Sequence, residues 1–153
     1  MPDLPQVGWC ANVLAVDSIV EMVAAIEATS AALPPKTPVG LWLTETMLKE
    51  NVQPLQQWLR QSGCPLIGVN AFPQGAFHEP IIKDAVYLPD WSRQERLDYT
   101  VDAAIALAEL LGRKGEGGLT TVPIGWPAHD IDIDAAADNI RLACEEIEKI
   151  TDA

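Results

Sequence analysis

The chain is poor in basic side chains. It has 10 Lys and Arg against 22 Asp and Glu in 153 residues, which gives a formal net charge of −12. Proteins that bind nucleic acid or anionic membrane surfaces draw much of their affinity from Lys and Arg. This acidic balance therefore argues against both kinds of partner. The composition, 48% hydrophobic and 21% charged, is that of a globular domain and argues against intrinsic disorder.

The signals of membrane, secreted and disulfide-bonded proteins are also missing. No stretch approaches the roughly 18 uninterrupted apolar residues of a membrane span, and residues 1–6 lack the basic and apolar regions of a secretory signal. Cys10, Cys64 and Cys144 are far apart and form no CxxC pair. Free thiols in a reducing compartment are the simplest interpretation. We therefore expect a cytoplasmic protein without membrane insertion.

Common metal-binding and phosphate-binding motifs are absent. The two histidines, His78 and His129, form no HxxxH or HExxH pair and no cluster with cysteine. Their spacing therefore predicts no metal site in this chain. The glycine-rich run at 112–118 precedes an expected strand, whereas a phosphate-binding loop precedes a helix. We interpret that run as a turn and expect no cofactor in this chain.

The sequence does contain a strand–helix pattern that occurs four times. Short apolar stretches predict buried strands, and each precedes a helical spacing of apolar residues. The expected strands are residues 7–14, 38–43, 65–70 and 117–125. The expected helices are 19–33, a short one after Thr44, 52–63, one from the Ser92 capping box to Gly112, and a last one that begins near Asp134.

Capping residues mark the ends of these helices. Ser18–Glu21 and Ser92–Glu95 have the spacing of capping boxes, in which the serine accepts a hydrogen bond from the third helical residue. Thr44 is a suitable N-cap, and Gly63 is a suitable C-terminal stop. These residues predict where three helices begin and where one ends.

Strands that are apolar on both faces and alternate with helices indicate an α/β domain with a parallel sheet. We find no linker or low-complexity tract, so residues 1–153 are expected to form a single domain. A (β/α)₈ barrel needs eight units and about 250 residues, and this chain has half that number of units. A half barrel and a small open parallel-sheet domain both fit, and periodicity alone does not choose between them.

In either architecture, ligands bind at the C-terminal ends of the strands. Asn12 lies at the end of the first expected strand, Asn70 ends the third, and Trp126 and His129 follow the fourth. Amide and imidazole groups can bond sugar hydroxyls, and aromatic rings line small-molecule pockets. The alternative is that these polar groups bond the backbone or solvent, and that the tryptophans only cover the end of the sheet.

The connection between the third strand and Trp91 is long for a compact domain, and long ordered loops are usually functional. It contains His78, which precedes Glu79 and could act as an acid or base. The alternative is a loop histidine bonded to the backbone or solvent. We expect Phe72, Phe77 and Trp91 to anchor this loop, since an ordered loop of such length needs its own small core.

Three segments together resemble the metabolite-traffic protein family of the Ebo gene cluster. They are VGWCANV at 7–13, NAFPQGAFHEPIIKDAVYLPDW at 70–91 and TTVPIGW at 120–126. The matching positions are Asn12, Asn70, Phe72, Pro73, Gly75, Phe77, His78, Pro89, Asp90, Trp91, Pro123, Gly125 and Trp126. Two positions depart from the family's pattern, since Ala71 stands where Gly is usual and Gln74 stands where Tyr is usual.

That family belongs to the xylose-isomerase-like TIM barrels, alongside sugar-phosphate isomerases and epimerases. The resemblance therefore implies the N-terminal half of a TIM barrel with isomerase or epimerase ancestry and a small polyol-type metabolite as substrate. A metabolite-binding protein without turnover is the alternative. The site residues expected on this basis are His78 as the tentative catalytic residue and Asn12, Asn70, Trp91, Trp126 and His129 on the substrate side.

The resemblance also bears on metal and assembly. In the wider superfamily the metal ligands come mostly from the fifth strand onward, so Zn²⁺, Mn²⁺ or Mg²⁺ is expected only in a full-length barrel. A half barrel exposes two strand edges and an apolar interior that a closed barrel buries. We therefore expect a homodimer or higher oligomer in which two halves complete the core.

Overall fold

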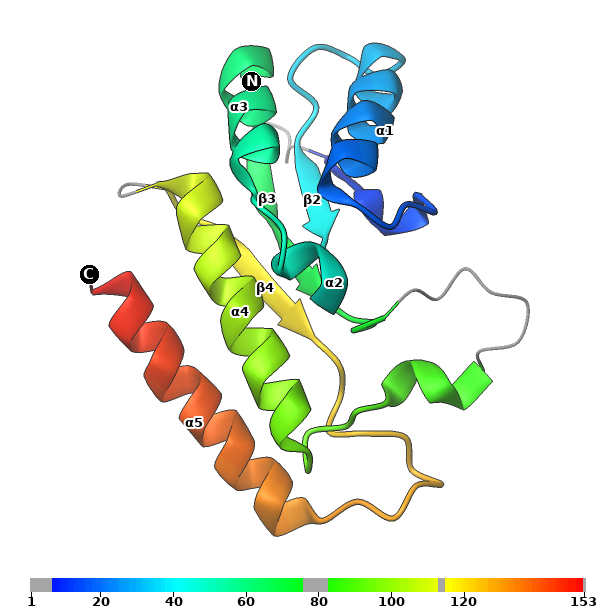
Figure 1. Ribbon diagram of the computed structural model, residues 1–153, viewed down its shortest axis with the longest axis vertical. Coiled ribbons are helices and arrows are strands. Elements are labelled where there is room, and N and C mark those ends of the chain that lie inside the picture. The colour runs from blue at the N-terminus through cyan, green and yellow to red at the C-terminus, as the bar shows by residue number, and fades with distance from the viewer. Residues whose placement is uncertain (1–6, 76–82, 113–114, 153) are drawn as a thin grey trace, which may run out of the picture.

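The protein was analysed as a computed structural model that describes residues 7–75, 83–112 and 115–152. The fold is mixed α/β, as predicted (Figure 1). Its elements in chain order are β1 (Trp9–Cys10), η1 (Ala11–Val13), α1 (Ile19–Ala31), β2 (Val39–Trp42), α2 (Glu45–Leu48), α3 (Gln53–Ser62), β3 (Leu66–Ala71), η2 (Lys83–Tyr87), α4 (Gln94–Leu111), β4 (Gly118–Thr121) and α5 (Ile133–Thr151). No helix in these described ranges is long and apolar enough to cross a membrane.

The four strands form one sheet in the order β1-β2-β3-β4, and every pair is parallel. Right-handed crossovers between sequential parallel strands place every helix on the same face of a sheet. Helix α1 packs on α3, α3 on α4, and α4 on α5, so these helices form one layer (Figure 1). The predicted α/β fold with a parallel sheet is therefore confirmed, and the open sheet agrees with the alternative of a small open parallel-sheet domain.

The main core lies between the sheet and this helix layer. Alternate strand residues such as Leu41 and Val69 face the helices and are fully or almost fully buried. Aliphatic side chains of the helices close over them, because each helix has an apolar stripe. The buried members from the helices include Ile19, Met22, Ile26, Met47, Leu55, Leu59, Tyr99, Ala103, Leu107 and Leu110.

A second core joins the start of α4, the end of β4 and α5. Its buried members are Trp91, Leu97, Val122, Ala136 and Ala143. The indole nitrogen of Trp91 donates a hydrogen bond of 3.1 Å to the carbonyl of Val122. Hydrogen bonds therefore fix the geometry of this core together with packing.

Most predicted caps are confirmed. The hydroxyl of Ser18 accepts a hydrogen bond from the amide of Glu21, and that of Thr44 accepts one from the amide of Met47. Gly63 ends α3 with a φ of 62°, in the left-handed region where glycine is favoured.

The predicted capping box at Ser92 does not form. The hydroxyl of Ser92 donates a hydrogen bond of 2.6 Å to the carboxylate of Asp90, so it is not the cap of α4, which begins at Gln94 with Arg93 before it. Ser92 therefore stabilises a turn before the helix, and α4 begins without a side-chain cap from the described residues.

Two strands are shorter than predicted. β1 ends at Cys10 because the chain turns into the 3₁₀ segment η1, and Leu14, directly after η1, still packs against the main core. β4 ends at Thr121, close to Pro123, which has no backbone N–H for a ladder. Apolar residues in both segments continue past the strand, which is why their pattern overestimates strand length.

Candidate functional site

Three aromatic rings lie against one another in tilted pairs at the carboxyl-terminal edge of the sheet. Phe72 follows β3, Tyr87 ends η2, and Trp126 follows β4. The ring centroids of Phe72 and Tyr87 are 5.6 Å apart, and those of Tyr87 and Trp126 are 5.0 Å apart. The outer ring, Trp126, is 38% exposed. We call these three residues the aromatic ledge, and it joins two strand ends that are far apart in the sequence.

A polar pair lies at the same end of the sheet. Asn70 and Thr120 are register partners on β3 and β4. The hydroxyl of Thr120 donates a hydrogen bond of 2.7 Å to the amide oxygen of Asn70, and the pair is exposed. Both groups can therefore exchange water for the hydroxyls of a ligand.

An imidazole–carboxylate pair holds the loop after Trp126. Nε2 of His129 lies 3.3 Å from a carboxylate oxygen of Asp84 on η2. The amide of His129 also donates to the carbonyl of Trp126, which closes the loop as a turn. The side chain is 21% exposed, and its Nδ1 atom is buried without a hydrogen-bond partner among the described residues. This arrangement fixes the position of the imidazole and hence of the loop.

The structure brings some of the predicted site residues together. Asn70, Trp126 and His129 lie at one end of the sheet, as the parallel strands require. Asn12 lies in η1, at the same end of the sheet, beyond β1. Because β2 separates β1 from β3, Asn12 sits two strands away from Asn70.

Trp91 and His78 have different outcomes. Trp91 is only 3% exposed and belongs to the second core, where its carbonyl also accepts a hydrogen bond from Asn139. It anchors the end of the loop, together with Phe72 of the aromatic ledge, and its contact with substrate stays a prediction. His78 and Phe77 lie outside the described residues.

Three members of this edge were missed by sequence reasoning. They are Asp84, Tyr87 and Thr120, which pair with His129, Trp126 and Asn70. Thr120 could have been found from the sequence, because it is a polar residue within an expected strand. Such a residue lies beside a residue of the neighbouring strand at a fixed register, here Asn70. The other two come from η2, a 3₁₀ segment for which the apolar pattern gave no sign.

Two buried polar side chains of α4 hold this edge in place. The guanidinium of Arg96 donates to the carbonyls of Pro89 and Ala71, at 2.8 and 3.0 Å. The hydroxyl of Tyr99 bonds the carbonyls of Leu43 and Pro73. Burial lowers the pKa of Arg96 to about 10 and raises the pKa of Tyr99. α4 therefore clamps the ends of β2 and β3 through the chain's own carbonyls.

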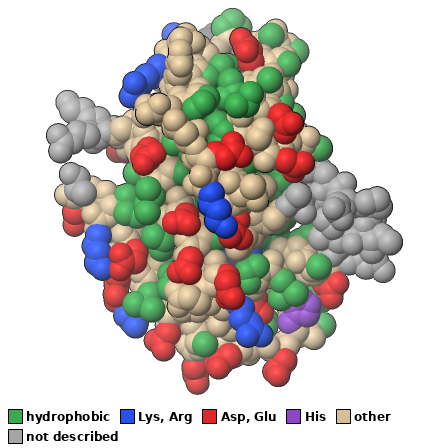
Figure 2. Space-filling model, in the orientation of Figure 1, with side chains coloured by type: hydrophobic (Ala, Val, Ile, Leu, Met, Phe, Trp, Pro, Cys, Tyr) green, Lys and Arg blue, Asp and Glu red, His purple; other side chains and the backbone are tan. Residues whose placement is uncertain are grey.

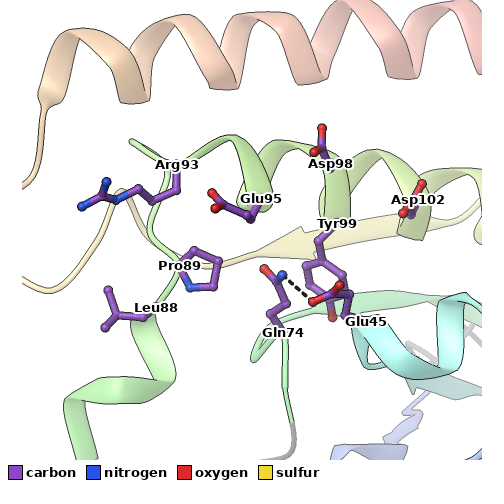
Figure 3. A pocket seen from close by; sticks show the side chains of 9 residues that line it. All are labelled: Glu45, Gln74, Leu88, Pro89, Arg93, Glu95, Asp98, Tyr99 and Asp102. Atoms are coloured by element: carbon purple, nitrogen blue, oxygen red, sulfur yellow. Dashed lines mark hydrogen bonds between the residues drawn. The ribbon is translucent and has the colours of Figure 1, made fainter.

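A separate groove of about 580 Å³ lies on the helix-covered side of the sheet (Figure 3). It runs between α2, the segment after β3 and the first turns of α4. Its lining residues are Glu45, Gln74, Leu88, Pro89, Arg93, Glu95, Asp98, Tyr99 and Asp102. None of the predicted site residues lines this groove, so the sequence analysis did not locate it.

Within the described ranges, no three His, Cys, Asp or Glu side chains come together closely enough to hold a metal ion. Comparison with known proteins gives no further guide: no protein-family description, curated protein or solved structure matches this chain.

Proposed function

We propose that this chain binds a small polyol-type metabolite at the carboxyl-terminal edge of its sheet. The observation that carries the proposal is the exposed ring of Trp126, at the end of the aromatic ledge, on the same edge as the exposed Asn70–Thr120 pair. An aromatic ring packs on the apolar face of a sugar, while amide and hydroxyl groups bond its hydroxyls.

The arrangement of strands and helices supports a relation to the xylose-isomerase-like barrels. A sequential parallel order with all helices on one face is the arrangement of four consecutive units of a (β/α)₈ barrel. A doubly wound sheet instead reverses its strand order and carries helices on both faces. Together with the resemblance of the three segments, this favours the half barrel as the origin of the fold.

Binding is better supported than turnover. When Nε2 of His129 donates to Asp84, the remaining ring nitrogen is the buried Nδ1 atom, which has no access to a ligand. This histidine is therefore a positioning residue, and His78 remains the proposed catalytic residue. Because the described residues do not provide a metal site, we derive no step through Zn²⁺, Mn²⁺ or Mg²⁺. Isomerase or epimerase activity is the second candidate, and it belongs to a complete barrel.

We infer that two copies of this chain associate through the face of the sheet that none of the described helices covers. The strand residues on the side of the sheet away from the main core carry no charge, and Trp42 among them is already buried within the chain. They are Cys10, Gly40, Trp42, Gly68, Asn70, Gly118 and Thr120. Two copies with a net charge of −12 each could approach through this face without bringing charges together. Light scattering should give a mass of two chains or more, and a mass of one chain at all micromolar concentrations would contradict the proposal.

Titration with pentoses, hexoses and their phosphates tests the proposed site. Trp126→Ala should weaken binding about tenfold, since one aromatic contact contributes about 0.5–1.5 kcal/mol. Ile133→Ala is the matched control, because Ile133 is also exposed and lies at the start of α5. Equal affinities of the wild type and Trp126→Ala would refute the proposed ledge.

Asn70→Ala separates a binding role from a structural one. If Asn70 bonds the ligand, the change should weaken binding while it alters the free energy of unfolding by only about 1 kcal/mol. If Asn70 only ties β3 to β4 through Thr120, the unfolding midpoint should fall and binding should follow it. Calorimetric titration and thermal melting of the same sample distinguish these results.

A further inference from the structure

Carboxylates predominate in the groove beside α4, although Arg93 also lines it and Lys49 pairs with Glu45. Figure 2 shows Asp and Glu side chains gathered on this face around a few Lys and Arg. Glu95, Asp98 and Asp102 line it from α4, at intervals of three and four residues. Figure 3 shows Asp98 at the outer rim, where its carboxylate points away from Gln74 and accepts a hydrogen bond of 2.8 Å from Gln94. Residues at such intervals lie along one stripe of a helix. Their separations along the helix axis are about 4.5 and 6 Å, from a rise of 1.5 Å per residue. Three carboxylates therefore follow one another along one wall.

The fourth carboxylate of the groove is already neutralised. One oxygen of Glu45 accepts a hydrogen bond of 2.6 Å from Lys49, and the other accepts one of 3.0 Å from the amide nitrogen of Gln74. The bond from Lys49, then that from Gln74, lowers the pKa of Glu45. By contrast, burial and the neighbouring Asp98 raise the pKa of Asp102. Lys49 offsets part of this increase, and Asp98 accepts a hydrogen bond from Gln94. A bound cation would relieve the repulsion that remains between Asp98 and Asp102.

Gln74 gives an independent sign of a missing ligand. Its side chain is 94% buried, since the residue is 6% exposed, and it extends into the groove (Figure 3). Its amide nitrogen has to face Glu45, because a carboxylate only accepts hydrogen bonds. The amide oxygen is therefore left as an acceptor, and it has no donor among the described residues. Buried acceptors without partners are rare and costly in proteins.

The other residues that line the groove are mostly apolar, and the charged one among them, Arg93, lies at its outer end. Leu88 and Pro89 form the wall opposite the stripe, and the ring of Tyr99 lies at the floor. Arg93 lines the groove at its outer end, where its guanidinium points away from the three carboxylates (Figure 3). The groove therefore combines acceptors at regular intervals with apolar surface between them.

We propose that this groove binds a linear polyamine, with its ammonium groups on Glu95, Asp98 and Asp102 and its methylene chain against Leu88 and Pro89. Spacers of three or four methylenes separate successive ammonium groups by distances similar to those between the carboxylates. The amide oxygen of Gln74 is enclosed at the edge of the groove, so its side chain has to turn outward before an ammonium can supply the donor that it lacks among the described residues. The groove lies on the helix-covered side, so it is distinct from the proposed metabolite site.

A divalent cation fits the groove less well. A compact ion needs several oxygens within one coordination sphere. The described residues do not provide three carboxylates at such distances. An extended ligand with several separate positive charges matches a row of carboxylates, whereas Mg²⁺ does not.

Titration of the full chain with spermidine by calorimetry tests the proposal. At 150 mM salt, where unspecific attraction to an acidic surface is screened, one spermidine should bind per chain with a saturable isotherm. Glu95→Gln combined with Asp98→Asn should weaken this binding about tenfold, because both residues are exposed and each lost ion pair with an ammonium contributes at most about 1 kcal/mol. Absence of saturable binding, or equal binding of Mg²⁺ at the same concentration, would overturn the proposal.

A charge-matched control removes the effect of net charge. Glu27→Gln combined with Glu148→Gln changes the net charge from −12 to −10, the same as in the groove variant, and both residues are exposed and far from the lining. This control should bind spermidine as the wild type does. An equal loss in the control and the groove variant would show attraction to the whole surface and would refute a site.

Two single changes test the chemical class. Arg93→Gln removes a repulsive charge at the end of the groove, so it should tighten spermidine binding about threefold. A weaker affinity in this variant would mean that the ligand needs an anionic end, which a polyamine lacks. Gln74→Leu should weaken binding about threefold through the lost acceptor. Because Gln74 is buried, its thermal midpoint is measured alongside, and unchanged affinity in a folded Gln74→Leu would contradict the proposal.

Discussion

The two hydrophobic cores of this protein are built on different principles. The main core takes alternate residues of β2 and β3, and aliphatic side chains of α1, α3 and α4 close over them. The second core is smaller and is organised around Trp91, whose ring nitrogen, backbone amide and carbonyl are all hydrogen-bonded. Aliphatic packing dominates the first core, in which Tyr99 is a hydrogen-bonded exception, whereas the second core is centred on a single hydrogen-bonded tryptophan.

This difference bears on the position of the candidate site at the carboxyl-terminal edge of the sheet. Trp91 is bonded to Val122 and to Ile124, so the second core fixes the path of the chain after β4. The same stretch leads to Trp126 of the aromatic ledge. The main core holds the strands, and the second core fixes the path of the chain after β4. Mutations in the two cores should therefore destabilise different parts of the fold.

Trp91→Ala should have the largest effect. Truncation of a buried tryptophan costs about 3–5 kcal/mol, and this one also removes the indole donor to Val122. Hydrogen exchange should accelerate in β4 and α5 while β2 and β3 stay protected. Equal acceleration in all strands would show that the two cores unfold as one unit.

Gly68→Ala should come next, because a Cβ atom at this position would overlap the backbone of Gly118 on β4. Overpacking of this kind costs about 1–3 kcal/mol. Gly118→Ala is the matched control, since these two glycines are register partners and a Cβ at Gly118 meets nothing nearby. Denaturant titration should show the loss only for Gly68→Ala, and similar losses in both variants would contradict the expected β3–β4 contact.

Tyr99→Phe should have a moderate effect that depends on pH. Loss of the hydrogen bonds to Leu43 and Pro73 costs about 1 kcal/mol at neutral pH. The folded pKa of Tyr99 is raised above its unfolded value of about 10, so its contribution is complete below pH 10 and falls as pH rises above 10. The variant should therefore lose less stability than the wild type between pH 9 and 11.

Arg96 titrates in the same pH range as Tyr99 but has the opposite effect on stability. The folded pKa of Arg96 is lowered to about 10, so above pH 10 the unfolded chain binds the additional proton and the contribution of Arg96 to stability rises with pH. Arg96 is present in both proteins, but Tyr99 raises the pKa of Arg96, so the Tyr99→Phe change lowers that pKa further. The stability of the variant therefore rises more steeply with pH than that of the wild type, which acts in the same direction as the loss of the Tyr99 titration. A difference that does not change above pH 10 would show that Tyr99 is not buried as described.

The smallest effects should come from the helix caps. Ser18→Ala removes the cap of α1 beside the main core, and Asp132→Ala removes the cap of α5 beside the second core. Each should cost about 1 kcal/mol. Thermal melting should give similar losses, because both caps satisfy one backbone amide at a helix end. A much larger loss for Asp132→Ala would indicate that the second core depends on how α5 begins.

The sequence predicted the parts of the fold that depend on local signals. Ser18, Thr44 and Gly63 occupy the caps expected of them, because each needs only its own neighbours to form the hydrogen bond or the left-handed turn. Ser92 fails the same test because Asp90 competes for its hydroxyl. The lengths of β1 and β4 were overestimated, because apolar residues outside the strands also pack against the core, as Leu14 does.

The candidate sites were predictable only in part. Asn70 and Trp126 follow from the rule that parallel strands end at one edge, but their partners Thr120 and Tyr87 depend on register and on η2. The groove was missed because it joins α2, the segment after β3 and α4. The spacing of Glu95, Asp98 and Asp102 along α4 can be read from the sequence. The residues that lie across the groove from them can be identified only from the tertiary packing.

The single helix layer has a consequence for how this architecture grows and fails. The extensive contacts join each strand or helix to the next one in line: β1 to β2, β2 to β3, β3 to β4, and likewise through the helices. Such a chain behaves as a one-dimensional array, whose stability is a sum of units and the interfaces between adjacent units. A unit can be added at either outer strand without disturbing the others, and the outermost units are the first to fray.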